Sequence, residues 1–117
     1  MTLSINTKFE NNVSIISIEG EITFENSSQF RDVIDAECKA EHFNIVIDLV
    51  GLKYMSSAGM GVLVHGLKQT RSNNGDLRLI NLSEKMHRVF LITQFTNNFK
   101  IYKTLEEAVN SFTPANK

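Results

Sequence analysis

The chain of 117 residues has no long apolar run, one cysteine and no excess of charge of either sign. Its longest hydrophobic stretches fall short of the roughly 18 residues that a membrane-spanning helix needs, so we expect no membrane partner. Cys38 stands alone and excludes an intramolecular disulfide. Twelve Lys and Arg balance thirteen Asp and Glu, with no block of like charge, so nucleic acid is not an expected partner either.

The N-terminal residues also lack the apolar segment of a secretory signal, and we therefore expect a cytoplasmic protein. At 117 residues and 42% hydrophobic composition, the chain can bury one core but hardly two. We expect a single domain over residues 1–117, with a frayed tail at 113–117. The sequence contains no linker, internal repeat or low-complexity segment.

The first half of the sequence predicts a hairpin, a helix and a buried strand. Alternating residues at 3–9 and a β-branched run at 13–18 flank a turn of polar residues, which is typical of an antiparallel hairpin. Apolar residues at helical spacing predict a helix over about 27–40, with N-cap candidates at 26–28. The continuous apolar run at 45–47 is typical of a central strand that helices cover on both faces.

The second half keeps alternating helix and strand. Met60, Leu63, Val64 and Leu67 follow the i, i+3, i+4, i+7 pattern of a helix that ends near residues 73–75. The remaining predicted elements are a strand at 77–80, a helix capped by Ser83 that carries Met86, Val89 and Phe90, a strand at 99–102, and a helix at 105–112 that a capping box from Thr104 to Glu107 begins.

The order of these elements, β-β-α-β-α-β-α-β-α, defines the expected fold class. It predicts an α/β domain with a mixed, mainly parallel sheet of about four to five strands and about four helices. Right-handed crossovers make the inner strands parallel, and the first strand joins them by the hairpin.

The junction between the central strand and the following helix carries the most informative residues. The sequence Met55-Ser56-Ser57-Ala58-Gly59-Met60 runs from the strand through a turn into the helix, so we predict that the Ser57 hydroxyl caps the helix N-terminus. Free N–H groups and the positive end of the helix dipole favour a phosphate at that point. The residues alone leave both readings open, a plain cap and a phosphorylation site.

Asp48-Leu49 followed by residues 52–63 resembles the signature of the bacterial anti-sigma factor antagonists, the STAS-domain family. Gly20-Glu21-Ile22 is similar to a corner of the same family. In the family pattern, usually Met-Asp-Ser-Ser-Gly or Met-Asp-Ser-Thr-Gly, the first serine after the aspartate is phosphorylated. That position is Ser57 here.

This resemblance implies a partner-switching cycle. The unphosphorylated protein binds an anti-sigma factor that is a serine kinase, the kinase uses ATP to phosphorylate it, and a metal-dependent serine phosphatase of the PPM type resets it. The chain would then be a substrate and not an enzyme. The residues that the resemblance assigns to partner binding are Glu21, Thr23, Met55, Ser56, Ser57, Ala58, Gly59 and Met60.

The chain departs from the family pattern around the acceptor. Ser56 replaces the usual aspartate, which makes Ser56 a competing acceptor, and Ala58 replaces the following hydroxyl residue. Thr23 stands where many relatives carry an acid, so an acidic contact is missing there. A neutral residue at 56 also changes which Arg or Lys of a partner could engage the turn.

The residues around Ser57 also have plain packing explanations. Tyr54 and Met55 end an apolar strand and are expected to pack, and Met60 lies on the apolar stripe of the helix. The alternative is that Met55 or Met60 joins an exposed contact patch. Gly59 and Gly61 weaken the helix, which indicates a close approach by a partner loop or a neighbouring strand.

Other functions find less support in the sequence. Ser57 is not in a Gly-x-Ser-x-Gly elbow and no His–acid pair is evident, so we expect no enzymatic activity. There is no P-loop lysine, and His42, His65 and His87 are scattered surface candidates without metal-ligand spacing, so we expect no cofactor and no metal. Two alternatives stay open: a constitutive STAS scaffold that is never phosphorylated, and a small-ligand carrier with a pocket beside the turn.

Overall fold

The computed structural model describes residues 2–94 and 97–112. Strands β1 (Leu3–Glu10) and β2 (Val13–Ile22) pair antiparallel, as the sequence predicts. The connecting residues Asn11 and Asn12 have φ angles of 55° and 63°. This left-handed backbone is tolerated by asparagine and gives a tight hairpin its turn.

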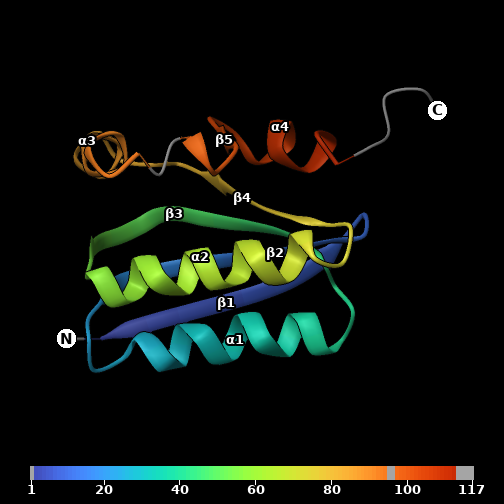
Figure 1. Cartoon of the computed structure of the whole chain (residues 1–117), viewed down its shortest axis with the longest axis horizontal. Coiled ribbons are helices and arrows are strands. Elements are labelled where there is room, and N and C mark those ends of the chain that lie inside the picture. The colour runs from blue at the N-terminus through green and yellow to red at the C-terminus, as the bar shows by residue number, and fades with distance from the viewer. Residues whose placement is uncertain (1, 95–96, 113–117) are drawn as a thin grey trace.

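One five-stranded sheet runs through the molecule in the order β1-β2-β3-β4-β5 (Figure 1). Strands β3 (Asn44–Met55), β4 (Asp76–Ile80) and β5 (Ile101–Tyr102) continue it, and the four strands β2 to β5 are parallel to one another. Helices α1 (Ser27–Lys39), α2 (Ser57–Arg71) and α3 (Glu84–Ile92) connect the parallel strands, and α4 (Leu105–Asn110) follows β5. The mixed, mainly parallel α/β fold and its element order are as predicted.

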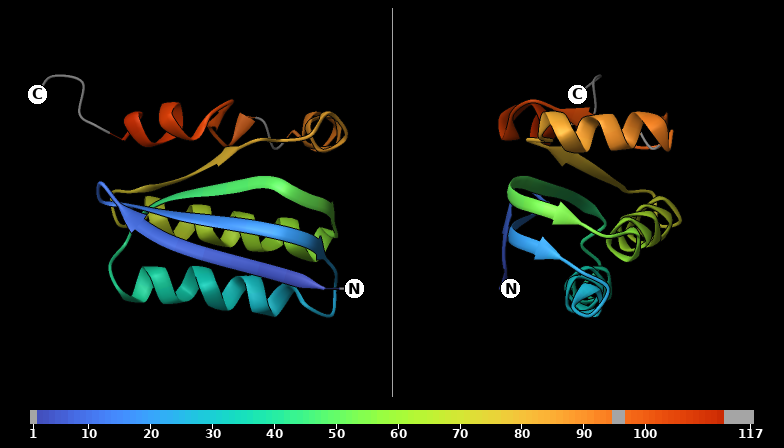
Figure 2. Two further views of the ribbon diagram at one scale, coloured as in Figure 1. Left: turned by 180° about the vertical axis from the view of Figure 1, so that it is seen from behind. Right: turned by 90° about the vertical axis from the view of Figure 1, so that its left-hand side faces the viewer.

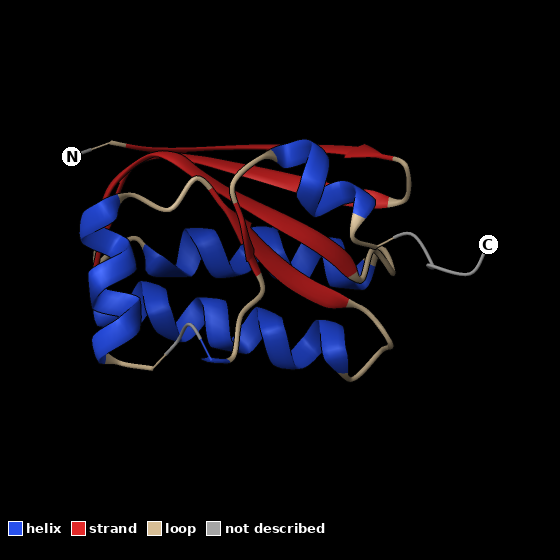
Figure 3. Cartoon of the chain, turned by 90° about the horizontal axis from the view of Figure 1, so that it is seen from above, coloured by secondary structure: helices blue, strands red, loops and turns tan. Residues whose placement is uncertain are grey.

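The sheet buries both of its faces over the central strands. Ile45 and Ile47 of β3 belong to the large core that α1, α2 and α3 share, whereas Val46 belongs to a second core with Ala108 of α4. Figure 2 shows α1 and α2 side by side on one face, and Figure 3 shows α4 on the opposite face. The apolar run that predicted a doubly covered strand therefore serves two separate cores.

Because β2 to β5 are parallel, their carboxyl ends lie at one edge of the sheet. The chain leaves this edge four times, before α1, α2, α3 and α4. We call it the carboxyl edge. Loops at this edge hold functional groups in many open α/β folds because they are fixed by the strands below them.

Near the C-terminus, the observed elements are shorter than the sequence predicts. The strand predicted at 99–102 is reduced to Ile101–Tyr102, because Phe99 is buried just before it, with its ring centroid 6.2 Å from that of Phe90. Val89 is 38% exposed although it shares the apolar pattern of α3, whose buried residues are Met86 and Phe90. The last helix ends at Asn110, and the tail predicted to fray at 113–117 lies outside the described residues.

Within residues 2–94 and 97–112, none of the helices combines the length and apolar character needed to cross a membrane.

Candidate functional site

The turn between β3 and α2 is fixed by the end of β2. Met55 pairs with Ile22 in the last step of the β2–β3 ladder, and the Ser56 N–H donates a hydrogen bond to the Ile22 carbonyl at 2.8 Å. The Met60 N–H donates to the Ser56 carbonyl at 3.1 Å, which is the first bond of the helix. The turn is therefore held by backbone on both sides before any side chain contributes.

The N-cap of α2 is Ser56, not Ser57. Ser56 has extended backbone angles, φ −75° and ψ 170°, and its hydroxyl accepts a hydrogen bond from the Gly59 N–H at 3.4 Å. Our prediction that Ser57 caps the helix was wrong by one residue, because the bond to Ile22 keeps Ser56 in the strand direction. Ser57 is instead the first residue of the helix and is exposed. Among the described residues, its hydroxyl has no hydrogen-bond partner.

This arrangement separates the two candidate acceptors. The Ser56 side chain is half-buried and already accepts a bond, whereas Ser57 presents its hydroxyl to solvent. The first turn of α2 contains no acidic residue, while Lys68 and Arg71 lie in its last turn. A negative group on Ser57 would thus meet the positive end of the helix dipole without a neighbouring carboxylate in that turn.

The residues that flank Ser57 divide between core and surface. Met55 is 8% exposed and packs in the large core, and Met60 is half-buried against the same core. The packing interpretation of both methionines is therefore confirmed. Gly59 is buried and Ala58 half-buried, which leaves Ser57 as the exposed residue of the stretch from Met55 to Met60.

Two aromatic side chains are exposed beside the serine turn. Tyr54, which we predicted to pack, is 47% exposed, and Phe24 is 81% exposed. Tyr54 pairs with Glu21 in the β2–β3 ladder, so the segment after β2 that carries Phe24 lies next to the segment that carries Ser57. The sequence analysis missed Phe24. The sequence signal that could have found it is an aromatic residue two positions after the end of β2, between the polar residues Thr23 and Glu25.

Thr23 holds the loop that presents Phe24. The Thr23 N–H donates to Asn26 Oδ1 at 2.7 Å, and the Asn26 N–H donates back to Thr23 Oγ1 at 3.3 Å. Asn26 Nδ2 also donates to the Glu21 carbonyl at 3.0 Å. Thr23 thus has a structural role, and the half-buried Glu21 lies in the same corner. The predicted site residues come together here at the carboxyl edge.

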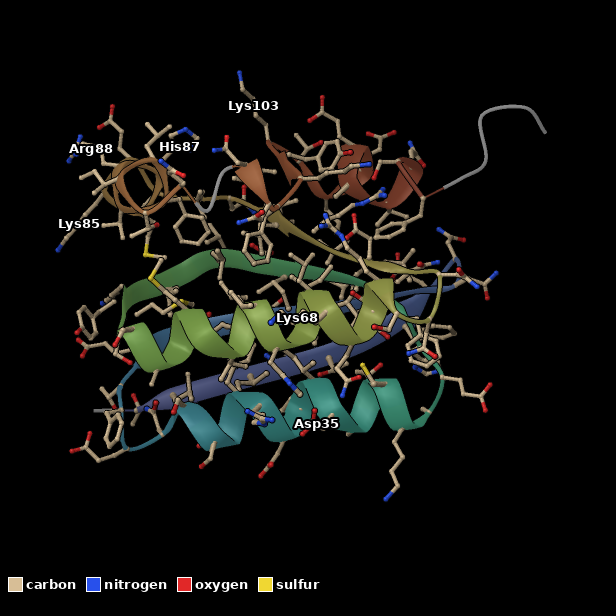
Figure 4. The ribbon with its side chains drawn as sticks, viewed as in Figure 1. Asp35, Lys68, Lys85, His87, Arg88 and Lys103 are labelled. Atoms are coloured by element: carbon tan, nitrogen blue, oxygen red, sulfur yellow. The ribbon has the colours of Figure 1, made fainter. Side chains whose placement is uncertain are left out.

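Nothing in the described part of the chain forms a group of three or more His, Cys, Asp or Glu side chains able to hold a metal ion. His42 and His65, expected at the surface, are instead partly buried, and each has a ring nitrogen within hydrogen-bond distance of a carboxylate. His42 Nδ1 lies 2.9 Å from Glu37 Oε1, and His65 Nε2 lies 2.7 Å from Asp35 Oδ1. Figure 4 labels Asp35 on α1, which His65 of α2 contacts across the helix pair.

A profile of the STAS domain matches residues 4–108, which is most of the chain. The chain belongs to the STAS-domain family, which it shares with the bacterial anti-sigma factor antagonists. It is 31% identical over 111 residues to the anti-sigma-B factor antagonist of Listeria monocytogenes, covering 94% of this chain and 96% of the relative. That relative is by its name an antagonist of an anti-sigma-B factor.

Solved structures agree with this assignment. A crystal structure from Thermotoga maritima, provisionally described as an anti-sigma factor antagonist, has a TM-score of 0.89 at 28% identity and covers 94% of this chain and 95% of its own. The Bacillus cell fate determinant SpoIIAA in its phosphorylated form has a TM-score of 0.73 at 21% identity, with 92% and 98% covered. At that identity, SpoIIAA supports the fold alone.

Proposed function

We propose that this protein is an anti-sigma factor antagonist that binds an anti-sigma factor serine kinase while Ser57 is unmodified and is released when Ser57 is phosphorylated. The observation that carries the proposal is the exposed Ser57 hydroxyl, which lies free at the first position of α2. In the reaction, the Ser57 oxygen bonds to the γ-phosphorus of ATP, ADP leaves, and the hydroxyl proton is lost. A PPM-type serine phosphatase would then remove the phosphate by hydrolysis.

The fold can accept a phosphate at this position. A phosphoserine carries about −1.5 to −2 charges at pH 7, and a helix N-terminus stabilises such an anion by about 0.3–1 kcal/mol when exposed. Ser56 keeps the cap in place of the family's aspartate, and serine is about as good an N-cap as aspartate. The substitution thus preserves the start of the helix while removing one negative charge beside the acceptor.

The surface around Ser57 explains why phosphorylation would release a partner. Phe24 and Tyr54 offer apolar area that a partner can bury, and interface energy concentrates in such aromatic anchors. A phosphate placed beside them would have to be desolvated in the same interface, which costs several kcal/mol without matching cations. Release therefore needs no change in the fold of this chain.

The first test is phosphopeptide mass spectrometry of the protein isolated from its own cells under several growth conditions. We expect phosphate on Ser57 whose amount changes with the conditions, and none on Ser56. Phosphate on Ser56 alone would contradict the acceptor assignment. No phosphate on either serine in the presence of a competent kinase would instead favour the unmodified scaffold.

Binding measurements separate the switch from the scaffold. Each candidate anti-sigma factor of the same cells is titrated with the wild type, Ser57→Ala and Ser57→Asp. A switch predicts tight binding by the first two and weakened binding by Ser57→Asp, whereas a scaffold predicts that all three bind alike. Phe24→Ser and Tyr54→Ser should weaken binding without preventing folding, since both side chains are exposed. Phe9→Ser, also an exposed aromatic but placed at the far end of β1, is the matched control.

A further inference from the structure

A cleft opens at the carboxyl edge, at the ends of β4 and β5. Its volume is about 410 Å³, within the range of small-molecule sites. In the sheet, β3 separates this cleft from the loop after β2 that carries Phe24, and the turn with Ser56 and Ser57 is not part of the lining. The lining residues come from the loop after β4, from α3, from β5 and from the residue after β5: Asn81, Leu82, His87, Ile101, Tyr102 and Lys103.

The position of this cleft follows from the topology of the sheet. β4 and β5 are parallel neighbours, but the chain leaves them toward opposite faces. After β4 it enters α3, whose Met86 and Phe90 join the core on the α1 and α2 face, and after β5 it enters α4, whose Ala108 joins the core on the other face. In open α/β sheets, two such diverging connections leave a crevice between them, and ligands bind there.

The walls of the cleft combine apolar side chains with one lysine and one histidine. Leu82, Ile101 and Tyr102 are half-buried and offer aliphatic and aromatic surface. His87 and Lys103 are exposed at its two sides. Figure 4 shows His87 on the side of α3 that is nearer to β5, whereas Lys85 and Arg88 project from the other side of the helix. Among the described residues that line the cleft there is no carboxylate.

The polar back of the cleft is already ordered. Asn81 has a left-handed backbone, φ 61°, and its Nδ2 donates to Asp48 Oδ1 at 2.9 Å. The same carboxylate oxygen accepts the Val50 N–H at 3.0 Å, so Asp48 is engaged behind the amide and does not line the cleft. The Ser83 hydroxyl accepts the Met86 N–H at 3.1 Å and caps α3. The positive charge of the cleft lining therefore comes from Lys103, and His87 adds a ring N–H donor.

We propose that this cleft binds a small organic anion, a compact ring or branched apolar body that carries one phosphate or carboxylate group. The body lies against Leu82, Ile101 and Tyr102. The anionic group lies beside Lys103, which donates a charged hydrogen bond, and beside His87, whose ring N–H donates a second hydrogen bond. This ligand site is separate from the Ser57 switch. It gives the domain a second input, a small molecule, at the same edge of the sheet.

The test is a titration of the full ¹⁵N-labelled chain with phenyl phosphate and, separately, benzoate, followed by NMR. We expect saturable shifts confined to the amides of residues 81–82, 87 and 101–103, with a Kd on the order of 1 mM for at least one probe. The two probes show which head group the cleft prefers. Phenol and inorganic phosphate, which carry the ring or the anion alone, should each bind at least several-fold more weakly.

Variants test whether the Lys103 side chain binds the anionic group of the probe. Lys103→Gln should raise the Kd of the tighter-binding probe roughly tenfold, which corresponds to the loss of about one charged hydrogen bond. Lys100→Gln removes another exposed lysine, which does not line the cleft, and should leave the Kd unchanged. His87→Asn provides a second, independent change in the lining. Ser57→Ala should bind the probe as the wild type does, so the result does not depend on the switch.

Three outcomes would overturn the proposal. The first is that neither aromatic anion gives saturable shifts at these residues up to about 10 mM, an affinity too weak to matter for a site of this size. The second is that phenol or inorganic phosphate binds as well as phenyl phosphate or benzoate. The third is that Lys103→Gln and Lys100→Gln retain the same affinity in spectra that show both variants folded.

Discussion

Gly59 lies directly against Ile22, so a Cβ atom at position 59 would be 2.8 Å from Ile22 Cγ2 and 2.6 Å from Met55 Cγ. The start of α2 thus packs onto the end of β2 through a glycine. Gly61, two residues further on, is exposed and would have nothing within 4 Å of an added Cβ. The sequence left two explanations for these glycines, a close approach by a neighbouring strand or by a partner loop. The neighbouring strand accounts for Gly59, and the space beside Gly61 is open to a partner.

The two glycines should respond oppositely to alanine. Gly59→Ala is expected to destabilise the fold by about 1–3 kcal/mol, because the methyl group must displace well-packed side chains. Gly61→Ala should stabilise it by about 0.4–1 kcal/mol, because alanine favours helix and nothing opposes its methyl group. Urea unfolding of both variants measures this. A neutral or stabilising Gly59→Ala would show that the approach of Gly59 to Ile22 does not limit the site, and a destabilising Gly61→Ala would contradict the open space at Gly61.

The two serines of the turn should also differ in stability. Ser56→Ala removes the cap of α2 and is expected to lower the free energy of unfolding by about 0.5–1 kcal/mol, toward the low end for caps because the bond to Gly59 is 3.4 Å long. Ser57→Ala, its matched control, should stay within about 0.5 kcal/mol of the wild type. Chemical denaturation gives both values. If Ser57→Ala lowered the free energy of unfolding more than Ser56→Ala, Ser57 and not Ser56 would be the cap.

The sequence predicts the order of elements and the doubly covered central strand because both rest on local periodicity and turn chemistry. Residues 45–47 and the hairpin turn at Asn11 and Asn12 are examples. It misplaces the cap of α2 by one residue, because a tertiary bond from Ser56 to Ile22 sets where the helix begins.

Two surface features depend on contacts between elements, and the sequence therefore does not predict them. The exposure of Phe24 and Tyr54 depends on how the ends of β2 and β3 meet. Likewise, the cleft between α3 and β5 depends on which face α4 covers, and the order of elements alone does not give that face.

Cys38 should react slowly with alkylating reagents in the folded protein. Burial raises the pKa of its thiol, and the nearby charges of Asp35 and Glu37 raise that pKa further. Since the thiolate is the reactive form, the folded protein holds less of it than the unfolded chain at any pH near 8. Iodoacetamide labelling should therefore be slower without urea than with it, and its rate should rise at a higher pH in the folded state.

The sequence contains one cysteine, so the mass increase after labelling reports this site alone. Equal pH profiles in the folded and unfolded states would contradict the raised pKa. A slower rate with an unshifted profile would point to restricted access of the reagent, because access changes the rate at every pH alike.

Asp76 joins three elements through two arginines, and its loss should be costly. It is 6% exposed, its Oδ1 accepts from Arg71 Nε at 2.8 Å, and its Oδ2 accepts from Arg78 Nε at 2.9 Å. Arg71 also donates to the Asn98 carbonyl at 2.8 Å, and Arg78 donates to Ser111 Oγ at 2.6 Å. The end of α2, the start of β4 and the residue after α4 thus depend on one buried carboxylate.

Asp76→Asn keeps the shape of the side chain but leaves two arginines without their counter-charge. We expect it to lower the free energy of unfolding by about 3 kcal/mol, as when a buried ion pair loses one partner. Arg71→Gln is the matched control: the Arg71 side chain is 46% exposed, and the buried Asp76 carboxylate keeps its other partner, Arg78, so we expect a smaller loss of about 1 kcal/mol. Thermal and urea unfolding compare them. If both variants lost a similar, small amount of stability, water would be solvating the arginines in place of the carboxylate. Arg78, whose side chain is 11% exposed, would then be more accessible to water than its contacts indicate.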